Sequence, residues 1–543
     1  MALNNNDLPT VPGASRRVLP ERRCGGVSLS TYPVPQVHPN PAAPPASTAH
    51  SAQFPDSTVR LSEVVSALSY ALDITEGQPQ GHAVRTCLIG MRLAEVVRLT
   101  DQERSALFYA LLLKDLGCSS NAARLCSLFS ADDLTLKRAH KLTDWTSGLA
   151  SAGYALSHVA PHRNPLARAW QVLQLGTREK GSGREMTTTR CERGADIARM
   201  LGLEPATQHA IRALDEHWDG SGMPLGLKGN DIPLLGRIAG LAQTVEVFAH
   251  AFGPEEAYEV ARRRRARWFD PELVLALQSF RDDSRFWSTL GSVDAIDQVG
   301  DLEPADRVIL ADGERLDGVA EAFARVVDAK SPYTARHSEG VANIAVGIAR
   351  AMGLSKDAQT TLRRAGLLHD IGKLGVSNLI LDKPGKLSPM EMDEMRKHTR
   401  YTAEILQRVT HFRAFAGIAA AHHERLDGRG YHVGLEAGDL CQLSRILAVA
   451  DICEALSAER PYRPAKPEEE VLDIMGEMVG TGICQVAYEG LLASMHGGVV
   501  GRRETEDGRQ KTGDRRRETG ENEEREQETG NGERGVPRKE TAA

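Results

Sequence analysis

The sequence predicts an all-α protein built from two related helical domains in tandem, and three observations support this fold class. The segment LDGVAEAFARVVDAK (316–330) places apolar residues at spacings of three and four, which is typical of an amphipathic helix. Ser388-Pro389-Met390-Glu391 combines the residues of a capping box with Pro at the first helical position. Long alternations of β-branched residues are absent from the sequence, so a large sheet is not expected.

The tandem arrangement follows from an internal repeat. RIAGLAQTVEVF begins at Arg237 and RILAVADICEAL begins at Arg445, which is an offset of 208 residues. Further upstream the offset is 255, and it aligns Lys114-Asp115 with His369-Asp370. The difference between the offsets gives the first copy 47 additional residues, which fall between about 116 and 190. Landmarks in one order at two consistent offsets indicate a duplication.

Composition completes the predicted organisation. Residues 1–58 are rich in Pro, Ser, Ala and Asn, and such a segment buries too little apolar surface to fold. The end of the chain is a dense mixture of Gly, Glu and Arg without an apolar period. We therefore expect a disordered segment over 1–58, a degenerate domain over 59–290, a linker over 291–312, an intact domain over 313–495 and a disordered charged tail over 496–543.

Bulk composition limits the classes of function. A net charge of −7 gives no support for binding a nucleic-acid polymer or a membrane surface. No uncharged apolar run reaches the roughly 18 residues of a membrane span. The eight Cys residues include no C-x-x-C pair, so they are expected to be reduced thiols in a cytoplasmic protein.

The second copy carries a mixed set of histidines and aspartates in a fixed order along separate predicted helices. These candidate metal ligands are His337, His369, Asp370, His398, His422, His423 and Asp451. A carboxylate can bridge two metals while neutral imidazoles complete each site, and Asp370 sits beside a histidine in LLHDIGKLG. Two metals roughly 3.5–4 Å apart polarise a phosphoryl group and activate water. Lys373, one turn after Asp370, is expected on the same face.

The first copy has lost this set. Lys114 stands in place of His369, Arg190 in place of His398 and Gln243 in place of Asp451, while Leu214 and Asp215 replace the histidine pair. Of the ligands, His82 and Asp115 remain, which are too few for a stable metal site. The first copy is therefore expected to be non-catalytic, with a structural, nucleotide-binding or regulatory role left open.

These residues resemble the HD-GYP subclass of the HD phosphohydrolase superfamily over residues 313 to about 495. The matching pieces are HS at 337–338, HDIGK at 369–373, LDKPGKLSPMEMDEMRKH ending at His398, HHERLDGRGYH at 422–432 and ADICEALSAERPYRPA at 450–465. The resemblance implies that Asp370 bridges two divalent metals, most simply Fe or Mn. His337, His369 and Asp451 would complete one site, and His398, His422 and His423 the other.

The resemblance also implies roles at the substrate. Asp370 and Lys373 would be catalytic, and Lys373, Gly430, Tyr431, Arg460 and Arg463 would contact the substrate. Two positions depart from the family pattern. His432 replaces the Pro of the Gly-Tyr-Pro step, and Tyr333 replaces the Glu that holds a third metal in some members. Two metals rather than three are therefore expected.

We thus expect a metal-dependent phosphodiesterase that hydrolyses a cyclic dinucleotide, with cyclic di-GMP favoured by the resemblance, to a linear product. Two alternatives remain open from the sequence. One is an HD phosphohydrolase of another nucleotide or phosphate ester, and the other is a non-catalytic signalling module. A homodimer or a signalling-protein partner is compatible with either. The number of metals retained per chain separates the catalytic reading from the binding module.

Overall fold

The computed structural model describes residues 59–145, 147–161, 163–178, 182–291, 299–334, 336–459 and 464–497. The disorder expected for 1–58 lies outside these residues, as does all of the expected tail beyond residue 497. The predicted all-α class is confirmed. In the described part of the chain, the only sheet is the antiparallel pair β1 (Val59–Arg60) and β2 (Leu310–Ala311).

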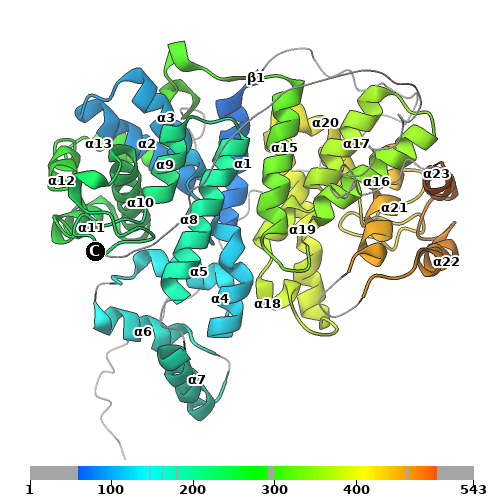
Figure 1. Ribbon diagram of the computed structural model, residues 1–543, viewed down its shortest axis with the longest axis horizontal. Coiled ribbons are helices and arrows are strands. Elements are labelled where there is room, and N and C mark those ends of the chain that lie inside the picture. Colours follow the sequence, from blue (N-terminus) through cyan, green and yellow to red (C-terminus); the bar gives the residue numbers. More distant parts are fainter. Residues whose placement is uncertain are drawn as a thin grey trace, which may run out of the picture. The chain divides into compact units, whose positions relative to one another are not determined.

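The helices fall into two series (Figure 1). The first series is α1 (Leu61–Thr75), α2 (His82–Val96), α3 (Asp101–Leu113), η1 (Cys118–Asn121), α4 (Ala122–Phe129), α5 (Asp133–Leu142), α6 (Gly148–His158), α7 (Pro165–Arg178), α8 (Ser182–Met200), α9 (Pro205–Ala213), η2 (Gly229–Asp231), α10 (Leu234–Phe252), α11 (Pro254–Arg263), α12 (Pro271–Gln278), α13 (Ser284–Leu290), η3 (Val299–Leu302) and η4 (Ala305–Arg307). The second series is α15 (Gly313–Asp328), α16 (His337–Ala351), α17 (Lys356–Leu368), η5 (Ile371–Gly375), α18 (Asn378–Leu381), α19 (Pro389–Arg408), η6 (Thr410–Phe412), α20 (Arg413–Ala420), α21 (Gln442–Ser457), α22 (Glu468–Met478) and α23 (Gln485–His496). None of the described helices is both long and apolar enough to cross a bilayer.

Local sequence explains the two helices that frame the site. On α15, Leu316, Val319 and Phe323 are almost fully buried, as the apolar spacing predicts. On α19, the Ser388 hydroxyl accepts from the backbone N–H of Glu391, whose side chain accepts from the N–H of Ser388. Because this capping box satisfies orphan donors, it fixes the start of the helix that carries His398.

The repeat is also visible in individual contacts. The carboxylate of Glu216 accepts from the backbone N–H groups of residues 225, 226 and 227, and Glu424 accepts in the same way from residues 433, 434 and 435. Gly117 and Gly372 lie at an offset of 255, and a Cβ at either position would overlap the carbonyl oxygen of Arg190 or His398, respectively. Both copies therefore need a glycine where the turn after α3 or α17 crosses a helix.

The two series share one continuous hydrophobic core. Helix α1 packs against η5 and α19 of the second series, and Ile74 lies close to Gly375. The segment predicted as a linker contains η3, η4 and β2, and its buried Glu303 accepts from the hydroxyls of Ser62 at 2.7 Å and Tyr109 at 2.6 Å. These contacts place the turn that carries Asp370 against the first copy. The domain boundaries themselves stay predictions.

The 47 additional residues of the first copy fall between η1 and α8, in the stretch that contains helices α4 to α7. In the second series, the short α18 alone occupies the corresponding position between η5 and α19. In Figure 1, α6 and α7 form a pair that lies below α4 and α5. A small separate cluster of Ala131, Leu136 and Tyr154 packs α6 against α5. The insertion is therefore an ordered helical addition, and α4 and α18 lie in contact with each other.

Substitution of the two crossing glycines tests this packing. Gly372→Ala and Gly117→Ala should each lower the free energy of unfolding by about 1–3 kcal/mol, because backbone must shift to admit the methyl group. The matched control is Gly318→Ala on α15, where a Cβ meets no atom within 4 Å. That change should raise stability by about 0.5–1 kcal/mol, because it removes the conformational freedom of glycine. Urea unfolding measures all three, and equal effects at Gly372 and Gly318 would contradict the packing.

Candidate metal centre

The predicted ligands of the second copy come together from five segments of the chain. His337 is the first residue of α16, and His369 and Asp370 lie at the junction of α17 and η5. His398 is on α19, Asp451 is on α21, and His422 and His423 follow α20. All are at least 90% buried except His423, whose side chain is 30% exposed. The site is therefore closed on most sides and open at His423.

One face of the Asp370 carboxylate meets two histidines. Its Oδ2 lies 3.4 Å from His337 Nε2 and 3.2 Å from His369 Nε2. Asp451 Oδ1 lies 3.3 Å from His337 Nε2 and 3.7 Å from His369 Nε2. Ligand atoms of His337, His369 and Asp451 all lie within 4.8 Å of one another. This group can surround a first metal ion.

The other face of Asp370 meets a second pair of histidines. Oδ1 lies 3.6 Å from His398 Nε2 and 3.6 Å from His422 Nε2, and these two nitrogens are 3.3 Å apart. Ligand atoms of His398, His422 and His423 again lie within 4.8 Å of one another. Each oxygen of one carboxylate therefore faces a different histidine group, and this geometry would allow Asp370 to contact two metal ions.

Contacts on the far side of each ring set its orientation. The Nδ1 atoms of His369, His398 and His422 lie 2.7, 2.6 and 2.7 Å from the carbonyl oxygens of Gly366, Met395 and Ala419, respectively. A carbonyl only accepts, so each Nδ1 carries the proton and each Nε2 presents a lone pair to the centre. The Nδ1 of His337 contacts the Glu454 carboxylate instead. The rings of His369, His398 and His422 are thus held in the tautomer that binds metal through Nε2.

The chemistry of this donor set fits divalent metal ions. His369 Nε2 and Asp370 Oδ1 are buried and have no hydrogen-bond partner among the described residues, which is costly unless another group satisfies them. Burial lowers the pKa of His398 to about 3 and holds that of His423 well below its usual value. Burial opposes ionisation of Asp370, but His369 and Lys373 outweigh it and hold its pKa well below the usual range. Neutral imidazoles and an ionised carboxylate are the forms that bind metal.

His337 is the exception in this set. Burial disfavours its charged form, but the carboxylates of Asp370, Asp451 and Glu454 outweigh burial and hold its pKa well above the usual value. Binding of a metal at Nε2 would therefore release a proton from this ring.

The predicted substrate-contacting residues divide into two groups. Lys373 Nζ lies 2.5 Å from Asp370 Oδ2, and its side chain is 20% exposed. The Tyr431 ring lies 4.8 Å from that of His423, with the Arg396 guanidinium 5.5 Å from its centre. Gly430 lies in the same turn, where a Cβ would overlap the backbone of Glu424. Lys373, Gly430 and Tyr431 thus border the centre, whereas Arg460 and Arg463 lie outside the described residues.

Sequence reasoning missed Glu454. It lies three residues after Asp451, one helical turn further along α21, so spacing alone could have pointed to it. The repeat carried a second signal, because Glu246 holds the corresponding place at the offset of 208 and contacts His82 Nδ1 in the first copy. A carboxylate behind a metal-binding histidine fixes the ring and raises its basicity.

In the first copy, lysines occupy the surroundings of the corresponding carboxylate. Lys114 Nζ contacts Asp115 Oδ2 and lies 3.0 Å from His82 Nε2. Lys141 Nζ, from the insertion helix α5, lies 3.2 Å from Asp115 Oδ1 and 3.1 Å from Glu76 Oε2. Arg190 and Asp215, which replace His398 and His423, form an ion pair. Glu76, Asp115 and Cys118 are close enough to hold a metal, but two ammonium groups already neutralise these carboxylates.

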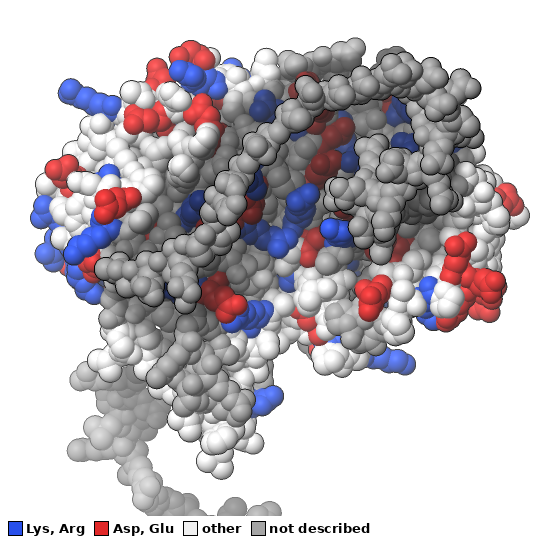
Figure 2. All heavy atoms as spheres, viewed as in Figure 1, with Lys and Arg blue, Asp and Glu red and all other residues white. Residues whose placement is uncertain are grey.

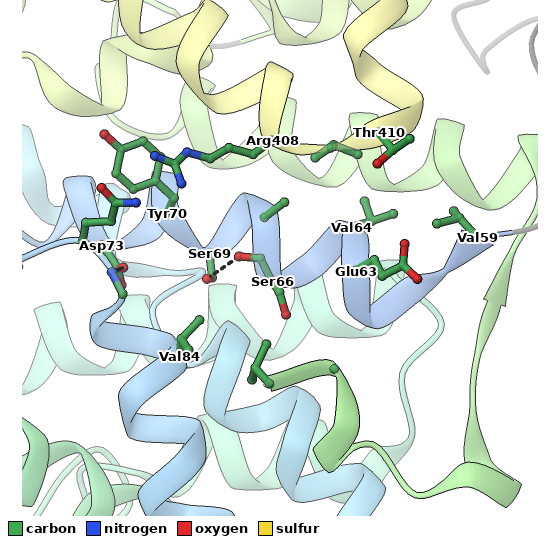
Figure 3. A pocket seen from close by; sticks show the side chains of 16 residues that line it. Val59, Glu63, Val64, Ser66, Ser69, Tyr70, Asp73, Val84, Arg408 and Thr410 are labelled. Carbon is green, nitrogen blue, oxygen red and sulfur yellow. Dashed lines mark hydrogen bonds between the residues drawn. The ribbon is translucent and has the colours of Figure 1, made fainter. Parts of the chain in front are cut away.

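A separate hollow of about 380 Å³ lies where α1 meets the end of α19. Figure 3 shows Arg408 beside Tyr70, and the guanidinium is 4.0 Å from the centre of that ring. Asp73 lies at its base and accepts backbone N–H bonds from Gly81 and Ala83. The lining residues belong to the junction between the copies rather than to the metal centre. On the face of the described chain seen in Figure 2, acidic and basic side chains are intermixed.

Comparisons with known proteins identify relatives of this chain. The family model described as "HD domain" matches residues 172–273 and 321–483, one segment in each copy. The 3'3'-cGAMP-specific phosphodiesterase 3 of Vibrio cholerae is 43% identical over 439 residues, which cover 81% of this chain and 95% of that protein. A crystal structure of a cyclic GMP-AMP-specific phosphodiesterase of the same organism has a TM-score of 0.56 at 39% identity, covering 81% of this chain and 98% of the other.

A further relative matches a smaller part of the chain. A cyclic di-GMP phosphodiesterase of Thermotoga maritima is 42% identical over 139 residues, which are 25% of this chain and 38% of that protein. The fold, the paired histidine groups around Asp370 and these relatives define a metal-dependent phosphohydrolase. Within that class, the chain belongs to the HD superfamily and to its HD-GYP branch.

Substitution of the residue behind His337 tests the metal centre. Glu454→Gln should weaken binding of Mn(II) by about 10–100-fold, because the His337 ring loses the carboxylate that holds it and keeps it basic. The matched control is Glu246→Gln, which makes the corresponding change in the first copy and should leave Mn(II) bound. For both variants, the metal content that remains after dialysis is measured by mass spectrometry. Retention of Mn(II) by Glu454→Gln at the wild-type level would show that Glu454 does not support the centre.

Proposed function

We propose that this protein is a metal-dependent phosphodiesterase that hydrolyses 3'3'-cGAMP to a linear dinucleotide. The observation that carries the reaction class is the arrangement of His337, His369, His398 and His422 around the two oxygens of Asp370. The cyclic-dinucleotide class is supported by relatives that act on 3'3'-cGAMP or on cyclic di-GMP. All the predicted metal ligands and substrate-contacting residues belong to the second copy.

The choice of 3'3'-cGAMP revises the cyclic di-GMP that the HD-GYP resemblance favoured. The relative that spans 81% of this chain, both copies included, is named as 3'3'-cGAMP-specific. The relative named for cyclic di-GMP matches 25% of the chain. A match that spans both copies is more specific than a match to a quarter of the chain. It therefore supports 3'3'-cGAMP as the substrate. Cyclic di-GMP is the second candidate because a relative named for it also matches the chain.

Two divalent ions, Fe or Mn, are proposed for the centre. His337, His369 and Asp451 would hold one ion, His398, His422 and His423 the other, and Asp370 would bridge them. Bound there, two such ions would supply positive charge for the phosphate and for the oxygens that attack and leave, and would make a water more acidic. The mixture of imidazole and carboxylate donors suits Fe and Mn, which take both ligand types.

The side chains bordering the centre have separate tasks in this proposal. Lys373 Nζ lies 2.5 Å from Asp370 Oδ2. A phosphate bound at the metals would therefore lie next to the positively charged ammonium group of Lys373. A preorganised cation near developing negative charge stabilises the transition state. The Tyr431 ring, next to His423 at the open side, offers a flat surface against which a sugar or base can pack. Arg460 and Arg463 are proposed to contact substrate phosphates or bases.

The first test is hydrolysis by the purified protein loaded with Mn(II), or with Fe(II) under anaerobic conditions. The expected result is linear product from 3'3'-cGAMP, with kcat/KM about 10-fold or more above that for cyclic di-GMP, because a site that hydrogen-bonds one base rejects another. Asp370→Ala should give no product, since it removes the bridging carboxylate. A preference for cyclic di-GMP would overturn the substrate. Two bound metals without product from either would move the search to other phosphate esters, and neither metal nor product would favour a binding module.

Lys373→Met tests the role of the lysine. The variant should lose about 10²-fold in kcat, the order of magnitude for removing one transition-state donor, with a smaller change in KM. Lys383→Met is the control, because Lys383 pairs with Glu391 at the surface of α19. Initial rates over a range of substrate concentrations separate the two constants. A larger effect on KM than on kcat would assign Lys373 to substrate binding alone.

A further inference from the structure

A buried chain of opposite charges runs from the inactive site of the first copy to the active turn of the second. It begins where Lys141 Nζ lies between Asp115 and Glu76, at 3.2 and 3.1 Å. Lys137 Nζ follows, 3.9 Å from Glu76 and 3.5 Å from Asp133. Asp133 Oδ2 then lies 3.4 Å from Lys330 Nζ, which belongs to the second copy. Every side chain of this chain of charges is at least 90% buried.

The last member ends at the turn that carries the bridging carboxylate. Lys330 Nζ donates to the carbonyl oxygen of Leu374 at 3.1 Å. Leu374 belongs to η5, whose N-cap is Asp370 and which also contains Lys373. The exit from the same turn is held by Asn378, whose backbone N–H donates to Asp133 Oδ1 at 2.9 Å and whose amide donates to the Lys330 carbonyl at 2.8 Å. Through these hydrogen bonds, Asp133 and Lys330 hold both the end of η5 and the first residue of α18 in place.

Asp133 comes from a helix of the first copy. It is the first residue of α5, one of the helices that lie between η1 and α8 in the first copy, whereas the second copy has α18 alone between η5 and α19. Lys330 and Lys137 hold the pKa of Asp133 at about 2 against the opposing effect of burial. Because a buried charge without its partner is strongly unfavourable, Asp133 and the two lysines depend on one another for their positions.

We propose that the insertion of the inactive copy positions the catalytic turn of the active copy, with Asp133 and Lys330 as the positioning residues. A metal centre loses affinity and rate when its ligands shift by a fraction of an ångström, so support of η5 acts directly on Asp370 and Lys373. The inference rests on the proposed function for its rate readout. Its metal-binding readout does not depend on the identity of the substrate.

The test compares two lysines in the same network. Lys330→Met removes the donor to Leu374, whereas Lys137→Met removes an equal charge from beside Asp133 but leaves the Leu374 contact in place. Lys137 itself donates to the carbonyl of Thr75 in the first copy, at 2.9 Å. Both variants are therefore expected to melt at a lower temperature than the wild type. A purely structural ion pair would make them alike in every measurement.

The positioning role predicts a difference in the full-length protein loaded with Mn(II). Lys330→Met should lower kcat for cyclic-dinucleotide hydrolysis by about 10-fold with KM changed by less than about 3-fold, and should weaken Mn(II) binding by about 10-fold, as loss of support behind metal ligands does. Lys137→Met should stay within about 3-fold of the wild type in all three constants. Asp133→Asn keeps an acceptor for the backbone N–H of Asn378 and removes the charge that holds Lys330. It should therefore shift kcat in the same direction as Lys330→Met.

Three outcomes would overturn the inference. One is an equal loss of kcat and Mn(II) affinity in the two lysine variants, and another is wild-type behaviour of Lys330→Met. If Lys330→Met does not fold, Asp133→Asn decides, and wild-type constants for that variant count against the inference. If the wild-type protein hydrolyses neither dinucleotide, the proposed function fails, and the Mn(II) affinities of the same variants still decide the positioning role.

Discussion

The contact on which the rest of the centre depends is the buried carboxylate of Asp370 between two groups of imidazoles. A single buried carboxylate surrounded by neutral rings is unfavourable unless positive charge accompanies it. In the second copy Lys373 supplies part of that charge, and the donor set is suited to metal ions for the remainder. In the first copy Lys114 and Lys141 supply it from within the chain. The two copies thus meet one electrostatic requirement in two ways.

Much of this centre could be predicted from the sequence because its ligands are short-range features of helices. His369-Asp370 and His422-His423 are adjacent pairs, and capping and apolar spacing placed the helices that carry them. The internal repeat added a comparison within one chain, since Lys114 and Arg190 marked where ligands had been replaced. The fold class required no more than helical periodicity and the near absence of strand patterns.

The parts that could not be predicted depend on contacts between distant segments. Nothing near Lys330 in the sequence indicates that its ammonium group reaches Leu374 and Asp133, which is 197 positions away. Lys141 lies in a segment without a recognisable motif, and its partners Glu76 and Asp115 come from two other places in the chain. Glu454 was within reach of spacing rules, but α21 also carries other polar residues. Partner choice among buried charges is a property of the packed chain.

The ammonium groups around Asp115 also bear on how the first copy could change with time. A return to metal binding would need imidazoles in place of Lys114 and Arg190, yet Asp115, Glu76 and Asp215 all rely on cations already present. Replacement of Lys114 would leave the buried Asp115 with Lys141 as its cation, and replacement of Arg190 would remove the partner of Asp215. Each such intermediate would lose an ion pair and is expected to be less stable than the present chain. A single substitution can therefore remove a metal ligand from the second copy. Restoring the ligands of the first copy requires several substitutions, and the early ones cost stability.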